Sequence, residues 1–355
     1  MTGDQLTLSG LTDILAPGSL KVYWNGNILR ADGSVNYATV SSLVSPDGVR
    51  VANALWSSVR SVSRFMQTSA AQLDTYHTGS GNLWAGGLGD FARMSAGSRA
   101  DGFEYNGGGY AVGADHAFSS QFTGGLSFGQ TFGTNRASRG DASFKQTGVM
   151  GGLYTRFQHE LGKTSSLSID SYAAYGNIEN RGSMRLSDGE HAGDRWNDAV
   201  VNLGLKASWT IKLDDSQTLT PFAGMNYEHG AQQDIMMKTA SGEHSFRDGS
   251  MQSWSVPVGL TWRKIFSLGE TGRLIPEATI AYIGEISRNT PGVNTDILGR
   301  NVKVEGTNPG RNAIQANAGL RWIINNAWST GVSYTVESRR DMTNQGVNGS
   351  VNYTF

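Results

Sequence analysis

The feature that most constrains this fold is a two-residue alternation of large apolar side chains with small or polar ones, recurring from about Asn82 to the C-terminus. Successive side chains of a β-strand point to opposite sides, so period two is typical of strands with one apolar face. Phe122, Leu126, Phe128 and Phe132 show it simply, because every residue between them is Thr, Gly, Ser or Gln. Twelve such segments can be counted, near residues 83–92, 105–118, 122–132, 149–157, 167–175, 201–211, 219–227, 254–262, 274–286, 314–324, 328–336 and 347–355.

The connections between the segments alternate between short and long. Five read as tight turns: Ser119-Ser120, Leu161–Ser165, Asp214–Gln217, Leu268–Gly272 and Asn325-Asn326. The six longer polar ones lie near Met94–Gly102, Asn135–Ala142, Asn180–Asp194, Gly230–Gly249, Asn289–Pro309 and Arg339–Gln345. A soluble sandwich or propeller has no reason to place all long loops at one end, whereas an outer-membrane barrel with short periplasmic turns does. The alternation and the even strand count predict an all-β membrane protein, a 12-stranded antiparallel up-and-down transmembrane β-barrel.

The polar strand face indicates which side of the barrel meets water. It consists mostly of Gly, Ser, Thr, Asn and Gln, in a chain of 355 residues with 47 glycines. This suits a hydrated lumen and an apolar exterior, and no run approaches the roughly 20 apolar residues of a membrane helix. Aromatic residues near segment ends are expected to form girdles at the membrane interfaces: Trp84, Trp254, Trp262, Trp322, Trp328, Tyr353 and Phe355.

Composition excludes several kinds of partner and site. The net charge is −1 and no basic run occurs, so nucleic acid is not an expected partner. Cysteine is absent, which removes disulfides and thiolate metal sites, and the six histidines show no metal-ligand spacing. We expect no metal, no cofactor and no catalytic residue. The start of the chain lacks the regions of a signal peptide, so we expect a longer natural chain if the protein is exported.

A helix precedes the barrel. Ser45-Pro46-Asp47 is typical of a helix start, and an amphipathic helix of about 25 residues should follow. Its apolar stripe is Val51, Leu55, Val59, Val62 and Met66, and its opposite side carries Arg50, Arg60 and Arg64. Its position before a barrel predicts that it lies in the lumen, the alternative being a helix docked outside.

Carboxylates on the lumen face are the expected partners of these arginines. Strand parity assigns to that face Asp170, Glu228, Glu277, Glu285 and Glu337. The glycines at 107–109 are expected to let the barrel wall approach the helix.

These patterns divide the chain into three regions. Residues 1–45 look β-rich but are too few for a core of their own, so we interpret them as the end of something longer. Residues 46–81 hold the helix and a short hinge, and residues 82–355 the barrel.

Residues 46–355 resemble the translocator domain of the monomeric autotransporter family. The resemblance is carried by four motifs: Asn82-Leu-Trp-Ala-Gly-Gly-Leu-Gly, Gly113-Ala-Asp-His, Gly124-Gly-Leu-Ser-Phe-Gly and the terminal Val351-Asn-Tyr-Thr-Phe355. It implies a location in the bacterial outer membrane, in contact with its lipid, with the chain's own N-terminal passenger exported to the cell surface. It also implies a monomer whose pore is plugged by the linker helix.

The resemblance assigns two further roles. A terminal strand with Val347, Val351, Tyr353 and Phe355 resembles the signal read by the barrel-assembly machinery. Some members cut themselves at an Asn-Asn pair in the helix, where a lumen carboxylate helps the asparagine to cyclise. Here only Asn53 is present, followed by Ala54, so self-cleavage is not expected.

Two alternatives are a diffusion porin and an outer-membrane lipid hydrolase. The helix argues against a porin, because it would block the pore. A hydrolase would need an outward histidine beside an outward serine, and His116 has only the turn residues Ser119 and Ser120 nearby.

Overall fold

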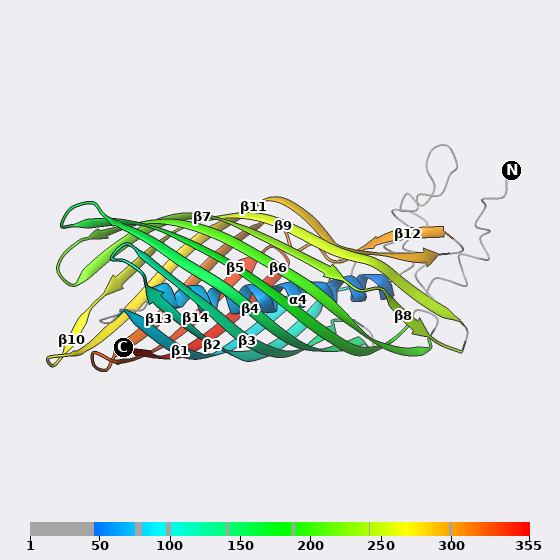
Figure 1. Cartoon of the computed structure of the whole chain (residues 1–355). Coiled ribbons are helices and arrows are strands. Elements are labelled where there is room, and N and C mark those ends of the chain that lie inside the picture. Colours follow the sequence, from blue (N-terminus) through cyan, green and yellow to red (C-terminus); the bar gives the residue numbers. More distant parts are fainter. Residues whose placement is uncertain are drawn as a thin grey trace.

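The computed structural model describes residues 46–74, 80–96, 101–139, 142–186, 189–240, 242–297 and 300–355. The expectation of a β-rich segment at 1–45 and most of the expected hinge lie outside these residues. Figure 1 shows a long barrel of tilted strands with one helix running inside it.

Twelve long antiparallel strands form the barrel, as predicted. Each pairs with the next along the chain, and the last pairs with the first, from Asn82↔Thr354 to Met94↔Met342. Closure therefore leaves the wall without an open edge. The strands are β1 (Gly81–Met94), β2 (Phe103–Ala117), β3 (Phe122–Ala137), β4 (Ala142–Glu160), β5 (Ser165–Arg185), β6 (His191–Lys212), β7 (Gln217–Gln232), β9 (Glu243–Lys264), β11 (Gly272–Ile297), β13 (Asn312–Ile323), β14 (Trp328–Arg339) and β15 (Met342–Thr354).

The two strand faces separate lipid from lumen. On β3, Leu126 and Phe128 point outward and are 46% and 61% exposed, while Ser127 between them is buried. Trp322 and Trp328 are also exposed, near the end with the short turns. Trp84 is not part of a girdle, contrary to expectation. It lies one residue from outward Leu83, so strand parity turns it into the lumen.

The five tight turns lie where they were predicted. In one of them, the side chain of Ser216 donates to Asp214 Oδ1 at 2.8 Å and its amide donates at 2.7 Å. These two bonds and a third from Gln217 lower the pKa of the exposed Asp214 carboxyl. The prediction of a long loop at Arg339–Gln345 is wrong, because only residues 340–341 separate β14 from β15.

Other predicted loops are largely strand. β5 continues to Arg185 and β6 begins at His191, inside one expected loop. Two more contain hairpins formed by β8 (Ile235–Lys238) against β9 and by β12 (Arg300–Glu305) against β11. At the opposite end, the short β10 (Phe266–Leu268) follows β9 and pairs with the first residues of β11. On the β8 and β12 hairpins the outward positions are mostly polar because water surrounds the barrel there, whereas inward residues such as Ile235 and Val304 are buried. The β8 and β12 end lies opposite the C-terminus (Figure 1).

The helix α4 (Pro46–Ala70) has the predicted length and is followed by the short helix η1 (Ala71–Asp74). Its first turns lie near β8 and β12, and its last turns point toward the end with the C-terminus (Figure 1). Among the described residues, no helix is long and apolar enough to span a membrane.

Candidate functional site

The apolar stripe of α4 packs against the inside of the barrel wall. Its five residues are all buried, with Met66 the most exposed at 7%. A Cβ placed on Gly176 would come within 2.5 Å of Val62, and one on Gly230 within 2.8 Å of Val59. Glycine at these wall positions therefore allows the close approach of the helix.

The glycines at 107–109 do not have the role that we expected. A Cβ on Gly107 would meet the hydroxyl oxygen of Tyr105 at 2.3 Å and its ring at 2.6 Å, and one on Gly109 would meet the neighbouring strand at Gln130. Neither contact involves the helix. The glycines that accommodate it lie on other strands, among them Gly129 beside Phe65.

The polar side of α4 is enclosed too. Ser57 accepts from Asn135 Nδ2 at 2.6 Å, and Ser61 shares a hydrogen bond of 2.8 Å with the Tyr105 hydroxyl. Ser58 donates to Asp198 Oδ2 at 2.5 Å. Helix and wall are thus bonded on both sides, which excludes a helix docked on the outside of the barrel and argues against an open diffusion pore.

Asp90 of β1 is the partner of two helix arginines. It pairs with Arg60, and Arg64 Nη2 lies 3.6 Å from the same Oδ1. The side chain of Asp90 is only 2% exposed. Sequence reasoning missed it, although its place before outward Phe91 assigns it to the lumen face.

The five predicted lumen acids make other contacts. Within the described part of the chain, none forms an ion pair with an arginine of α4. Glu228 touches the helix through a hydrogen bond from Ser63. The others pair with cations of the wall: Asp170 with Arg156 and Lys206, Glu277 with Arg263, Glu285 with Arg288 and Arg339, and Glu337 with Arg339.

The prediction that these acids pair with the arginines of α4 was wrong, because strand parity assigns a residue to one face of the wall but does not give its position along the barrel axis. All five acids face inward, yet only the tilt and stagger of the strands decide which of them reaches the helix.

Arginines of the wall clamp the end of the helical segment at Asp74. Arg156 Nη2 and Arg263 Nη2 bind its two carboxylate oxygens at 2.7 and 2.8 Å. Arg156 also donates to the carbonyl of Leu73 at 2.6 Å, and Arg321 donates to the carbonyl of Asp74. Cations suit this position because the last carbonyls of a helix are unpaired and carry partial negative charge.

The opposite end of α4 is fixed by an apolar cluster and by polar contacts of Arg50 and Asn53. Val49 and Val51 pack with residues of the mouth: Phe144, Met184, Leu186, Trp196, Ile235, Met237, Phe246, Val293 and Val304. Arg50 Nε lies 3.2 Å from Asp101 Oδ2. Asn53 donates to the carbonyl of Asp101 at 2.9 Å and accepts from the amide of Thr307 at 2.8 Å.

Both the nitrogen and the oxygen of the Asn53 side-chain amide are therefore hydrogen-bonded. Cyclisation would require its nitrogen to leave Asp101 and attack the backbone carbonyl of Asn53 itself. None of its hydrogen bonds with the described residues goes to a carboxylate.

A family model described as the autotransporter β-domain matches residues 83–335, most of the barrel. The chain belongs to the autotransporter β-domain family. It is an outer-membrane β-barrel, as predicted.

Solved translocator structures share the fold of this autotransporter β-domain. The translocator domain of NalP from Neisseria meningitidis is 16% identical, with a TM-score of 0.66 over 87% of this chain and 99% of that one. The transport unit of AIDA-I from Escherichia coli is 13% identical, with a TM-score of 0.64 over 88% and 99%.

Among curated relatives, the probable outer membrane protein pmp20 of Chlamydia pneumoniae is 23% identical over 292 residues. The match covers 77% of this chain but 16% of that protein. The autotransporter β-domain therefore spans a minor part of the length of this relative.

The C-terminus of the autotransporter β-domain lies at the seam of the barrel. Phe355 accepts from the amide of Gly81 at 3.1 Å and donates to its carbonyl at 2.9 Å. Its ring covers Gly81 and is 64% exposed on the lipid side. Val347, Val351 and Tyr353 share this outward face, so the terminal strand presents a continuous apolar row.

The described wall residues do not place a serine directly opposite His116, as a lipid hydrolase would need. His116 points outward, but its cross-strand partners are Gly81 and Gly124. The described ranges contain no group of three or more His, Asp or Glu residues that could hold a metal ion.

Proposed function

We propose that this β-domain anchors a longer protein in the outer membrane and carries the N-terminal passenger of that protein to the cell surface. The observation that supports this most is α4 itself, enclosed in the lumen with its N-terminal turns at the β8 and β12 end. A chain that passes through its own barrel in this direction leaves the segment before Pro46 outside the cell. On this view residues 1–45 end the passenger, 46–81 are the linker helix, and 82–355 are the translocator.

The helix then serves as the plug that remains after export. It is held at three heights, by the apolar cluster of the mouth, by Asp90 in the middle and by the arginine clamp on Asp74. An ion pair that keeps some water, such as Arg156–Asp74, contributes about 1 kcal/mol, whereas loss of one partner of the more deeply buried Arg60–Asp90 pair costs more. Several together oppose backward sliding of the helix and support the wall from inside.

An N-terminal epitope tests the direction of export. The full chain is produced with an export signal and an epitope before Met1, and intact cells are probed with antibody and protease. We expect the epitope to be labelled and removed on intact cells, while the barrel stays protected. An epitope that is reached only after the outer membrane is opened would overturn the proposal.

We further propose that the domain acts as a monomer embedded in outer-membrane lipid, without enzymatic activity and without cleavage at Asn53. The barrel closes on itself through β1 and β15, so no second chain is needed to complete the wall. The apolar row of Val347, Val351, Tyr353 and Phe355 supports recognition of the last strand by the barrel-assembly machinery.

A further inference from the structure

Three cations form an uninterrupted row across the outer face of the barrel. Lys145 of β4 is the direct cross-strand partner of Arg181 of β5, which is in turn the partner of Arg195 of β6. All three point outward and are exposed. Like charges directly opposite each other destabilise a sheet. A row of three is therefore unfavourable unless an anion lies against it.

Two of the three cations have no acidic partner among the residues that the structure describes. Arg195 lies 3.5 Å from Glu179, a contact in which both side chains are about half exposed. Within the described residues, neither Lys145 nor Arg181 forms an ion pair with a carboxylate. Their charge is available to something outside the chain.

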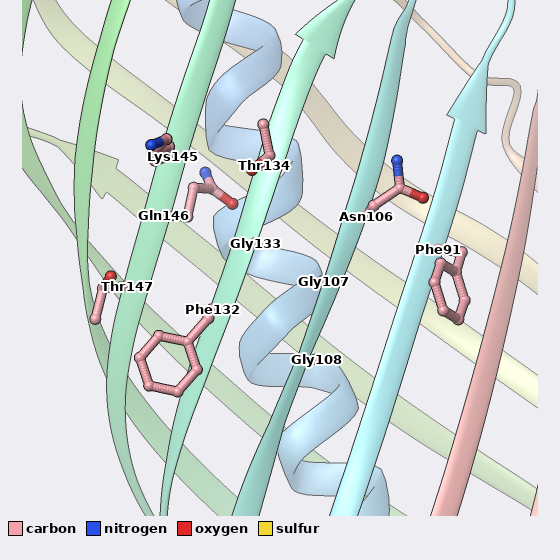
Figure 2. A pocket seen from close by; sticks show the side chains of 10 residues that line it. All are labelled: Phe91, Asn106, Gly107, Gly108, Phe132, Gly133, Thr134, Lys145, Gln146 and Thr147. Carbon is pink, nitrogen blue, oxygen red and sulfur yellow. The ribbon is translucent and has the colours of Figure 1, made fainter.

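A groove of about 560 Å³ lies beside Lys145 on the outer surface. Figure 2 shows it across β1 to β4, with the helix behind the wall. Phe91 and Phe132 stand on its two sides, and Gly108, at an outward position of β2, leaves its floor without a side chain. Gly107 and Gly133 also line the groove, but their missing side chains would point into the lumen, where the ring of Tyr105 lies. The two phenylalanine rings form the apolar part of the groove, and Lys145 borders it together with Asn106, Thr134 and Thr147.

The groove and the cations lie at the outer border of the membrane-facing band. On β4 the exposed apolar positions begin at Val149, four residues after Lys145, a distance of about 13 Å along a strand. Lys145 thus lies near the first residue of β4, Ala142, at the end of the barrel away from the short turns.

We propose that this face binds a phosphorylated glycolipid of the outer leaflet, with its phosphate on Lys145 and Arg181 and one acyl chain in the groove between Phe91 and Phe132. Lysine and arginine are the residues that bind phosphate in proteins, and clusters of them next to a membrane select anionic headgroups. The groove adds a requirement for an acyl chain that a free phosphate cannot meet. The inference does not depend on passenger export, because any barrel with this face would bind the lipid.

The test is a binding measurement on the full chain in detergent. Diphosphorylated lipid A, its dephosphorylated form and phosphatidylglycerol are titrated in turn, and bound lipid is counted by native mass spectrometry. We expect diphosphorylated lipid A to bind at least tenfold more tightly than the other two. Equal binding of phosphatidylglycerol would overturn the assignment to a glycolipid.

Variants locate the site. Lys145→Glu with Arg181→Glu should weaken lipid A binding at least tenfold, whereas Lys212→Glu, an exposed cation at the other end of the barrel, should leave it unchanged. If the charge-reversal variant Lys145→Glu with Arg181→Glu does not fold, Lys145→Gln with Arg181→Gln takes its place in the measurement. Phe132→Ser should weaken the binding of lipid A and leave the binding of the acyl-free phosphorylated disaccharide unchanged. Unchanged lipid A binding in the variants of Lys145 and Arg181 would overturn the proposal.

Discussion

Arg60 of the lumen helix and Asp90 of β1 form an ion pair inside the barrel, in a place where Asp90 is almost completely shielded from water. Arg64 shares the same carboxylate. One carboxylate thus serves two cations of the helix and ties it to the first strand. Asp90 belongs to the strand that closes the barrel against β15, so the pair also links the plug to the seam.

Replacing Asp90 should lower the stability of the barrel, because Asp90 is the buried partner of Arg60 and Arg64. Asp90→Asn leaves Arg60 and Arg64 without their counter-ion, and loss of one partner of a buried pair costs about 3 kcal/mol. Thermal unfolding in detergent, followed by the gel mobility of the folded barrel, measures the loss. Asp215→Asn, in an exposed turn, is the control and should have no effect. Equal melting temperatures for the two variants would contradict the role of Asp90.

Removal of the helix should open the pore. A barrel lacking residues 1–74 loses the side chains that fill the lumen as well as the three contacts that hold them. Single-channel conductance in planar bilayers should rise well above that of the full chain. Arg60→Glu with Arg64→Glu should give an intermediate increase and a lower melting temperature, because two like charges would then face Asp90. Low, unchanged conductance after the deletion would mean that the helix does not block ion flow.

Addition of a single methyl group at Gly176 should lower the stability of the barrel, because the new carbon would clash with α4. Gly176→Ala places a carbon 2.5 Å from Val62, and overpacking of this kind costs about 1–3 kcal/mol. Gly151→Ala on the neighbouring strand is the matched control, since its new carbon lies at an ordinary 3.6 Å from Phe128 on the lipid side. Val62→Ala should restore the stability lost in Gly176→Ala. If it does not, the clash is with the wall rather than with the helix.

The bond between Asn53 and Ala54 should stay intact. The Asn53 side chain is bound to Asp101 and Thr307, which holds its nitrogen away from its own carbonyl. Intact-mass measurement after prolonged incubation of the folded protein should find one species. Asn53→Ala should lower stability by about 1–2 kcal/mol through the lost hydrogen bonds, without changing the mass pattern otherwise. Two fragments that meet at this bond would show that the barrel cuts its own helix.

Loss of Phe355 should affect assembly in cells more than folding in detergent. Its ring contributes burial of roughly 1.5–3 kcal/mol at most, and much of it remains exposed. Deleting it should leave detergent refolding nearly intact but strongly reduce the folded barrel recovered from outer membranes. Ile324→Ser, an exposed apolar position at the same end, is the control and should reduce both modestly. Equal losses in the two assays for the Phe355 deletion would show that it is only a structural residue.

The local pattern of the chain was enough to predict the strands, their faces and the tight turns. Period two is a property of neighbouring residues, so it predicts that Leu126 meets lipid and Ser127 meets the lumen without knowledge of the rest of the barrel. The same holds for α4, whose start at Pro46 and apolar stripe are local features. The polar strand ends near Arg185 and His191 were taken for loops because strands that project beyond the membrane lose the apolar alternation.

Contacts between distant residues depended on the tertiary structure. Parity placed Asp170 and Glu277 in the lumen, but the stagger of the closed barrel set them at the height of Arg156 and Arg263. The rotation of the helix then brought Arg60 to Asp90 and Val62 to Gly176. The cation row of Lys145, Arg181 and Arg195 likewise arises from pairing register, which no single strand contains. The sequence by itself determined which side of the wall each residue occupies, because that is a local alternation, and only closure of the barrel around the helix decided which residues meet.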